Sequence, residues 1–327
     1  MADIVVLNDQ DVEALISFSE NLRMIEQAFG DYNSGRSHVF PVVRENIATH
    51  KGIFGIKSGY LETQNILGFK AGGFWADNKS KGLANHQSVI VLFNPKTGQP
   101  CALVAANFVT QIRTAAIGAI GCKYLARQES RVLTIIGTGQ QGRNQLKAAL
   151  LVLPAVEEIF LYDIHAPAAA ALARDIAHYP QKIAVASTAE KACSNADVII
   201  TATSSYAAIV MAEWVKQGTH INAVGTDTRG KQELDPEIFA KAVVVVDNTD
   251  QSLYLGESQH PYARGIITRE SIHAEIGEII NGIKPGRVTR EEITLFDTTG
   301  VAIQDLATAG YAFEQALKKG IGSHITL

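Results

Sequence analysis

Apolar residues follow two different patterns along this chain, and the change between them predicts two domains. In the first third, a helix with Leu22, Ile25 and Phe29 at helical spacing is accompanied by short runs of strand-forming residues. The runs expected to form strands here are 4–7, 53–56, 66–74 and 88–93. Strands and helices mixed in this way predict a two-layer α/β arrangement.

From Arg131 onward the pattern changes to near-continuous apolar runs that alternate with amphipathic stretches. Runs that are apolar at nearly every position are typical of parallel strands covered by helices on both faces. The strands expected from this pattern are 132–136, 159–162, 183–186, 198–202, 221–224 and 243–246. The second pattern therefore predicts a parallel sheet with helices on both sides.

The ends of these patterns set the expected domain boundaries. An Ala-rich helical stretch at 110–125 leads into the second pattern, and the tail from Thr298 carries the apolar stripe of a helix that we expect to return to the first domain. A chain of 327 residues also exceeds the ~250–300 residues at which single cores stop growing. We expect one mixed α/β domain of residues 1–120 plus 302–327 and a second domain of residues 121–301.

Composition and charge exclude several classes of function. The net charge is -4 and no short segment concentrates Lys and Arg, so we expect no nucleic-acid partner. No basic region precedes an apolar stretch at the start and no apolar run reaches ~18 residues, so we expect a cytoplasmic protein with no membrane partner. The three cysteines are widely spaced and lack a Cys/His cluster, which favours buried hydrophobes over a disulfide framework or a metal site.

A glycine-rich motif directly follows the expected strand 132–136 and opens a helix. Its residues are Gly137, Thr138, Gly139, Gln140, Gln141 and Gly142. In such a turn the first glycine permits the bend, the second lets the backbone approach a pyrophosphate, and the third lets the helix pack closely on the strand. The helix N-terminus adds unpaired N–H groups and the positive end of a dipole. The motif therefore predicts a dinucleotide site in a Rossmann domain.

An acid stands where the ribose of a dinucleotide would lie. Asp163 ends the next expected strand, 21 residues after Gly142, and can accept hydrogen bonds from ribose hydroxyls. It would also repel a 2′-phosphate and no Arg follows it closely, so we expect NAD rather than NADP as the cofactor. Thr203 and Ser204 follow the expected strand 198–202, at the sheet end where ligands bind. They either border the cofactor or form a plain strand-to-helix turn.

Several further segments occur in order around the dinucleotide motif over most of the chain. They are Pro41-Val-Val-Arg44, Gly68-Phe-Lys70, Arg113-Thr114-Ala-Ala116, Val224-Gly225-Thr-Asp227 with the following Thr-Arg-Gly-Lys-Gln-Glu-Leu234, and Ile293-Thr-Leu-Phe-Asp-Thr-Thr-Gly300. In these segments the chain resembles the ornithine cyclodeaminase/μ-crystallin family. The resemblance implies an NAD-dependent oxidoreductase that moves a hydride to or from the α-carbon of an amino or imino acid. It also implies a homodimer joined through the non-Rossmann domain, which would bind the substrate. Thr114, Val224 and Gly225 would border the cofactor together with Arg113.

The resemblance places Arg44, Lys70 and Arg113 around the substrate carboxylate. The chemistry agrees, because guanidinium groups grip a carboxylate bidentately whereas a Lys can also donate a proton. A surface salt bridge for Arg113 and an outward-pointing Lys70 are the alternatives, and Arg44 could equally be an ordinary exposed arginine. Asp227 would lie beside the nicotinamide and exchange a proton with the substrate nitrogen, unless it only caps the turn before Gly230. This chemistry requires no metal.

Three positions depart from the family pattern and bear on the substrate. Cyclodeaminases that bind a diamino acid carry a carboxylate near the position where this chain has Lys57, and His86 and Arg229 also add basic groups. Either these are surface drift, or they indicate a second negative charge on the ligand, since a buried carboxylate requires a partner. Our first expectation is reduction of iminosuccinate to aspartate. The alternatives are alanine dehydrogenase or cyclic ketimine reductase chemistry, a redox-neutral ornithine cyclodeaminase, and a non-catalytic crystallin-like NAD(P)H-binding protein.

Overall fold

The structure is a computed structural model that describes residues 3–326, and its contacts divide the chain into two units. Unit 1 consists of the residues up to Arg113 and of those from Val301 onward, and unit 2 is Thr114–Gly300. The division falls inside a single helix, α3 (Asn107–Leu125), whereas the sequence pattern places it after residue 120. The helix keeps one composition through the division, so its residues give no sign of it.

Unit 1 is a mixed sheet with helices against one face. Asn8 and Ser17 cap its first two helices through reciprocal side-chain and backbone hydrogen bonds. The helices are α1 (Asp9–Leu15), α2 (Phe18–Asn33), the first part of α3, and α10 (Ala302–Lys319). The strands are β1 (Asp3–Leu7), β2 (Ser37–Val39), β3 (Val43–Ile47), β4 (Gly52–Leu61), β5 (Ile66–Trp75), β6 (His86–Phe93), β7 (Pro100–Ala105) and β18 (Ser323–Thr326).

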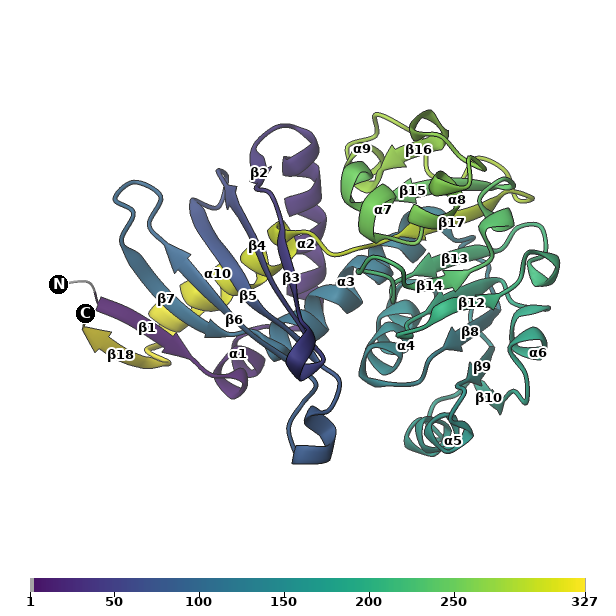
Figure 1. Ribbon diagram of the computed structural model, residues 1–327, viewed down its shortest axis with the longest axis horizontal. Helices are drawn as coiled ribbons and strands as arrows, with labels where there is room; N and C mark the ends of the chain where they lie inside the picture. Colours follow the sequence, from purple (N-terminus) through teal and green to yellow (C-terminus); the bar gives the residue numbers. More distant parts are fainter. Residues whose placement is uncertain (1–2, 327) are drawn as a thin grey trace. The chain divides into compact units, whose positions relative to one another are not determined.

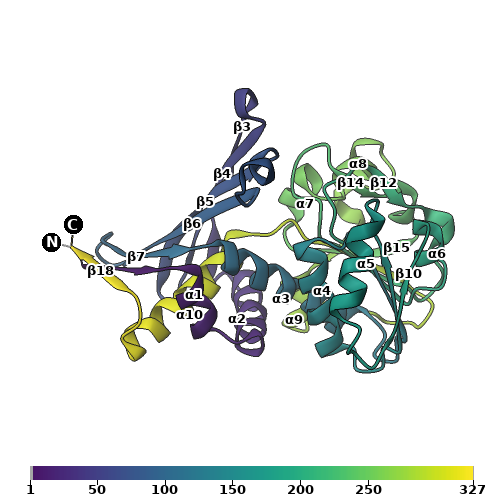
Figure 2. The same ribbon diagram turned by 90° about the horizontal axis from the view of Figure 1, so that it is seen from below.

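The strand order of this sheet is β18-β1-β7-β6-β5-β4-β2, with β3 also paired to β4. All these pairs are antiparallel except β1 with β7. Helix α10 packs along β4, β5 and β6 and contacts α1 and α2, and Figure 2 shows these three helices on the same side of the sheet (Figures 1 and 2). Gly310 makes this packing close, since a Cβ there would collide with the side chain of Ile66.

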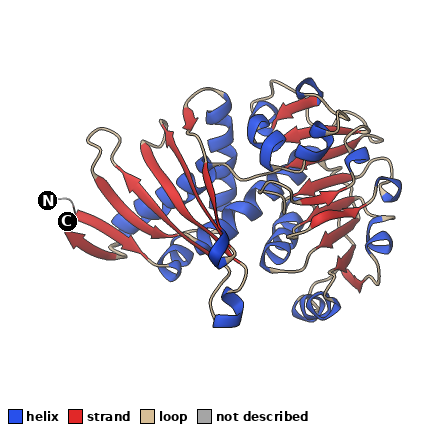
Figure 3. Ribbon diagram, in the orientation of Figure 1, coloured by secondary structure: helices blue, strands red, loops and turns tan. Residues whose placement is uncertain are grey.

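Unit 2 has the predicted parallel sheet, and its helices lie around the strands (Figure 3). Its strand order is β10-β9-β8-β11-β13-β17-β15-β16, and each pair is parallel. The first five strands have the order of a Rossmann domain, with the reversal between β8 and β11. The strands are β8 (Val132–Ile136), β9 (Glu158–Tyr162), β10 (Lys182–Val185), β11 (Val198–Thr201), β13 (His220–Ala223), β15 (Ala242–Val246), β16 (Ile272–Glu275) and β17 (Ile293–Asp297).

The remaining elements of unit 2 cover or extend this sheet. A short parallel pair is formed by β12 (Tyr206–Val210) and β14 (Gln232–Leu234). The helices, besides the second part of α3, are α4 (Gln140–Val152), α5 (Ala166–Asp175), α6 (Ala189–Cys193), α7 (Thr249–Leu255), α8 (Gln259–Ala263) and α9 (Ile276–Ile280).

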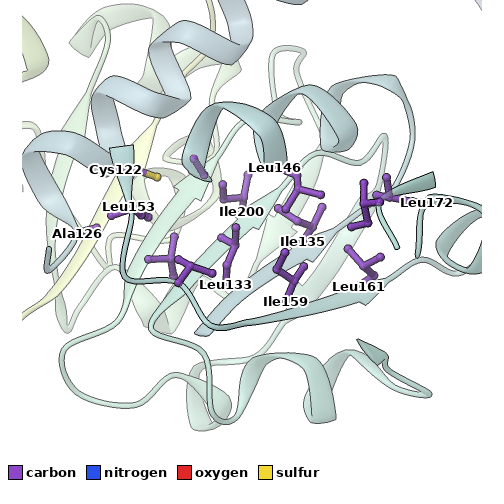
Figure 4. Packing of buried hydrophobic residues seen from close by; sticks show 14 of the residues in the cluster. Cys122, Ala126, Leu133, Ile135, Leu146, Leu153, Ile159, Leu161, Leu172 and Ile200 are labelled. Carbon is purple, nitrogen blue, oxygen red and sulfur yellow. The ribbon is translucent and has the colours of Figure 1, made fainter. Parts of the chain in front are cut away.

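The core of unit 2 explains why its strands are apolar at nearly every position. Leu133 and Ile135 of β8 pack against Leu146 of α4 with Ile159 and Ile200 of the neighbouring strands, all fully buried (Figure 4). A second cluster includes Ile136 and Ile199, on the alternate positions of β8 and β11, together with Ile221 of β13. Among the described residues, no helix is both long enough and apolar enough to cross a bilayer.

Candidate active site

The glycine-rich turn of unit 2 has the geometry of a phosphate-binding loop. Gly137 has a φ of +91°, a conformation that favours glycine, and a Cβ at Gly142 would collide with the carbonyl oxygen of Gly137. Gly139 is the N-cap of α4, supplies no side-chain cap, and a Cβ there would meet nothing within 4 Å. Gln140 and Gln141 form the first turn of α4. The uncapped N–H groups of this helix therefore border open space, as an anionic ligand requires.

Asp163 follows β9 and holds this turn in place. Its Oδ2 accepts hydrogen bonds from the backbone N–H of Thr138 at 2.8 Å and from the Thr138 hydroxyl at 3.0 Å. Its Oδ1 accepts from the N–H of His165 at 2.9 Å. The carboxylate thus stands beside the glycine-rich turn, where the sequence predicts the ribose contact. That contact itself stays a prediction.

Two loops at the carboxyl ends of β11 and β13 are joined by a buried acid that the sequence did not single out. Glu233 accepts hydrogen bonds from the N–H of Thr203 at 2.6 Å, the N–H of Gly225 at 2.9 Å and the hydroxyl of Thr201 at 2.7 Å. Ser204, which follows Thr203, is exposed, and Val224, which precedes Gly225, is half-buried. Glu233 therefore fixes both loops that are predicted to border the cofactor.

A second buried acid, Glu257, accepts hydrogen bonds from Glu233 and from residues adjacent to Glu233 and Gly225. It accepts from the hydroxyl of Thr226 at 2.5 Å and from the N–H groups of Glu233 and Leu234 at 2.8 and 2.7 Å. Burial and the adjacent Glu233 carboxylate raise the pKa of Glu257 to about 8, and burial also raises the pKa of Glu233.

Asp227 has a cationic neighbour that sequence reasoning missed. Its Oδ1 lies 2.9 Å from Nζ of Lys231, four residues later, and accepts a hydrogen bond from Thr228 at 3.0 Å. Lys231 also donates to the carbonyl of Gly225 at 3.2 Å. The sequence signal was present, because an acid and a Lys four residues apart are natural partners, although here they occupy a loop rather than a helix.

The register of the unit 1 sheet places four predicted substrate residues on one face. Lys57 pairs directly with Lys70, so both side chains project to the same side. Arg44 pairs with Gly55, two residues before Lys57, and His86 pairs with Phe74, four residues after Lys70. Since alternate positions share a face, Arg44, Lys57, Lys70 and His86 all lie on the side that α10 covers.

Lys70 and Arg113 meet at a carboxylate on α10 that the sequence did not identify. Nζ of Lys70 donates to Oδ1 of Asp305 at 2.8 Å, and Nε of Arg113 lies 3.1 Å from the same oxygen. Nη1 of Arg113 donates to Gln304 at 2.7 Å, and Lys70 also contacts the Thr110 hydroxyl at 3.4 Å. The Lys70 and Arg113 side chains are each 9% exposed and that of Asp305 is 1% exposed. The outward-pointing Lys70 and the surface salt bridge for Arg113 are therefore both wrong.

His86 corrects one part of the sequence prediction. Burial, together with the nearby charges of Lys70 and Arg113, lowers the pKa of His86 to about 4. The imidazole is therefore neutral near pH 7 and does not add the positive charge that we expected. A neutral imidazole still offers one donor and one acceptor to a ligand.

The other sequence-predicted residues are placed as follows. Arg44 is half-buried on β3, and Lys57 is half-buried on β4. Arg229 is exposed and belongs to unit 2, where its guanidinium lies 5.7 Å from the ring centre of Tyr254. Thr114 is buried, and its carbonyl accepts from Gln145 at 2.6 Å. No cluster of three or more His, Cys, Asp or Glu among the described residues is arranged to hold a metal.

Comparison with known proteins agrees with this geometry. Residues 2–320 match the model of the ornithine cyclodeaminase/mu-crystallin family. The chain is 39% identical to the alanine dehydrogenase of Archaeoglobus fulgidus over 99% of this chain and 98% of the relative. It is 38% identical to the iminosuccinate reductase of Paracoccus denitrificans over 99% of this chain and 100% of the relative.

Solved structures give the same picture. An archaeal alanine dehydrogenase dimer with bound NAD has a TM-score of 0.95 at 40% identity and 99% coverage of both chains. The P. denitrificans iminosuccinate reductase in complex with NAD⁺ has a TM-score of 0.93 at 37% identity, covering 99% of this chain and 100% of that one. The Δ1-pyrroline-2-carboxylate reductase of Thermococcus litoralis, in complex with NADH and L-proline, has a TM-score of 0.94 at 35% identity, covering 98% and 100%. With a family match over nearly its whole length, this chain belongs to the ornithine cyclodeaminase/mu-crystallin family.

Proposed function

We propose that this protein is an NAD(H)-dependent oxidoreductase that reduces an α-imino acid to an L-amino acid or catalyses the reverse oxidative deamination. The proposal rests on the buried cluster of Lys70, Arg113 and Asp305 in unit 1. Two buried cations against one carboxylate leave an excess of positive charge. A substrate carboxylate matches that excess.

The residues of unit 2 fit a dinucleotide cofactor. The open N-terminus of α4 would hold the pyrophosphate, and Asp163 would accept from the ribose. When bound, the nicotinamide supplies or accepts the hydride at the substrate α-carbon. Family relatives solved with NAD, NAD⁺ or NADH support this choice of cofactor.

The side chains of the protein would then handle charge and protons. Arg44 and Arg113 bind the α-carboxylate, because guanidinium groups grip carboxylates bidentately. Reduction of a C=N bond adds hydride at carbon and a proton at nitrogen. Lys70 and Asp227 are the groups that we assign to proton transfer, and general acid–base groups are typically worth ~10²–10⁴ in rate.

For the substrate we propose an imino-dicarboxylate, most simply iminosuccinate reduced to aspartate. Lys57 lies directly opposite Lys70 in the sheet, and its charge is close enough to help lower the pKa of Asp305. It would pair with the second carboxylate, while neutral His86 would donate a hydrogen bond to it. A Lys at this position also disfavours a diamino acid, whose distal ammonium would be repelled.

A monocarboxylate imine is the second candidate, because an alanine dehydrogenase is about as similar to this chain as the iminosuccinate reductase. The substitution Lys57→Ala separates the two candidates. It should raise KM for iminosuccinate without changing KM for pyruvate plus ammonia. Equal effects on both substrates would remove the argument for a dicarboxylate.

We also propose a homodimer that forms through unit 1. The sheet face opposite α10 carries alternate apolar residues that remain half-buried or exposed in the single chain, namely Leu67, Phe69, Val89, Val91, Phe93 and Leu103. A contiguous apolar face of this kind marks an interaction site, and the archaeal relative is a dimer. Leu103→Glu should dissociate the dimer, as measured by light scattering.

We expect the protein to act in the cytoplasm, consistent with three free cysteines.

The experiment that tests the activity follows NADH oxidation spectroscopically with a panel of imino acids. Iminosuccinate, pyruvate plus ammonia, glyoxylate plus ammonia and cyclic imines cover the substrate classes. We expect turnover with at least one α-imino acid and loss of turnover in Lys70→Ala. Stoichiometric NADH binding without turnover of any of these substrates would instead indicate a crystallin-like binding protein.

A further inference from the structure

We propose that Asp305 is a positioning residue for this reaction: it fixes the Lys70 ammonium and the Arg113 guanidinium relative to the substrate and keeps Lys70 protonated until the proton is transferred. The proposal rests on the proposed function for its catalytic part. The link between Asp305 and Lys70 is testable without turnover.

Three elements that are distant in the sequence, β5, α3 and α10, bring Lys70, Arg113 and Asp305 to a single carboxylate oxygen. Oδ1 of Asp305 lies 2.8 Å from Nζ of Lys70 and 3.1 Å from Nε of Arg113. The neighbouring Gln304 accepts from Nη1 of Arg113 at 2.7 Å, so α10 contacts the guanidinium through one ion pair and one hydrogen bond.

Burial strengthens the electrostatic interaction among Lys70, Arg113 and Asp305. All three side chains are at least nine-tenths buried, and charges in such surroundings interact more strongly than charges in water. Burial alone would raise the pKa of Asp305, but the charges of Lys70 and Arg113, with a smaller effect of Lys57, lower it below its usual value. Asp305 is therefore an anion at neutral pH. An adjacent buried anion favours the charged form of Lys70.

One carboxylate oxygen of Asp305 makes both contacts. Oδ2 of Asp305 is buried and has no hydrogen-bond partner among the described residues. A buried acid with a purely structural role normally satisfies both oxygens, as Asp197 of unit 2 does. That residue accepts from Arg127 at 2.7 Å and, through its other oxygen, from the N–H groups of Arg131 and Val132 at 2.8 and 3.1 Å. An unsatisfied acceptor beside a proton-donating Lys is more typical of a functional site.

The test compares Asp305→Asn with Asp197→Asn in the full-length protein. Asp197 is a matched control because it also contacts two cations, Arg127 and Lys216. Competitive acetylation across a pH series, read by mass spectrometry of the Lys70 peptide, gives the pH midpoint at which Lys70 becomes reactive. We expect this midpoint to fall in Asp305→Asn and to stay unchanged in Asp197→Asn. An unchanged midpoint in Asp305→Asn would overturn the proposal.

Turnover gives the second readout. In Asp305→Asn we expect kcat to fall about 10²-fold, with the alkaline limb of its pH profile moved to lower pH and NADH affinity retained. Asp305→Glu keeps the charge but displaces it, so kcat should fall while the Lys70 midpoint stays near that of the wild type. Wild-type kcat in Asp305→Glu would overturn the positioning role, and this variant also serves if Asp305→Asn does not fold. A shifted midpoint in a protein whose wild type reduces no imino acid would support the Lys70–Asp305 link and refute the proposed function.

Discussion

Replacing Glu233 with Ala should loosen both loops that are predicted to border the nicotinamide. The carboxylate accepts from the backbone N–H groups of Thr203 and Gly225 and from the hydroxyl of Thr201, and it is fully buried. The hydroxyl can rotate, but the two amides cannot. Both hydrogen bonds are only part-buried, so their loss costs about 1 kcal/mol each and about 2 kcal/mol together.

Hydrogen exchange at these two amides measures the effect directly. A loss of ~2 kcal/mol is a factor of about 30 in a local opening equilibrium, so the amides of Thr203 and Gly225 should exchange about 30-fold faster in Glu233→Ala. Glu233→Gln keeps one acceptor and should give a smaller change, and Glu237→Ala, at an exposed position, serves as the control. We also expect weaker NADH binding in Glu233→Ala. Wild-type exchange rates and wild-type NADH affinity in this variant would refute the role of Glu233 in fixing the two loops.

Further predictions concern the cofactor, the reacting centre and the pH dependence of stability. The wild type should prefer NADH, and Asp163→Ser should narrow the ratio of kcat/KM for NADH over NADPH; equal values in the wild type would contradict the assignment. Lys70→Ala or Asp227→Ala should lower kcat ~10²–10⁴-fold with little change in NADH affinity, and a variant that retains more than about a tenth of turnover would exclude that residue from proton transfer. The pKa of His86 is about 4 in the folded protein against 6.5 in the reference state, so the unfolded chain binds more protons in this window and stability falls as the pH drops from 6.5 toward 4. In urea unfolding, the free energy of unfolding should fall by about 2–3 kcal/mol less in His86→Gln than in the wild type when the pH is lowered from 7 to 4.5. An equal fall in both proteins would show that His86 does not titrate in this range.

The six strands expected in unit 2 match β8, β9, β10, β11, β13 and β15, because a strand buried on both faces is apolar at nearly every position, whereas β12, β14, β16 and β17 were not predicted. The expected strand 132–136 coincides with β8, and the glycine motif begins directly after it, since a parallel strand must be apolar throughout and a tight turn needs glycine. The boundary between the two units was harder to predict from the sequence. One continuous helix, α3, crosses it without a change in composition.

The candidate site was predictable where a residue type alone defines the chemistry. Lys70 and Arg113 are buried, which excludes the exposed alternatives, and their catalytic and binding roles remain predictions. Asp305 was not identified as a site residue because it lies between Ile303 and Leu306, in an apolar stripe that is typical of helix packing. The predicted charge of His86 was wrong because burial, and after it the cations Lys70 and Arg113 on other elements, lower the pKa of His86, and a linear pattern reveals neither effect.

The central claim is that hydride passes between the nicotinamide and the α-carbon of an amino or imino acid. Its most direct test incubates the protein with iminosuccinate, or with oxo acids plus ammonia, and NADH deuterated at C4 in each of its two stereochemical forms. Mass spectrometry and NMR then locate the label in the amino acid product. We expect one deuterium at the α-carbon from one of the two forms and none from the other, with aspartate as the preferred product. NADH oxidation without deuterium at the α-carbon, or no amino acid product with any of these substrates, would contradict the account.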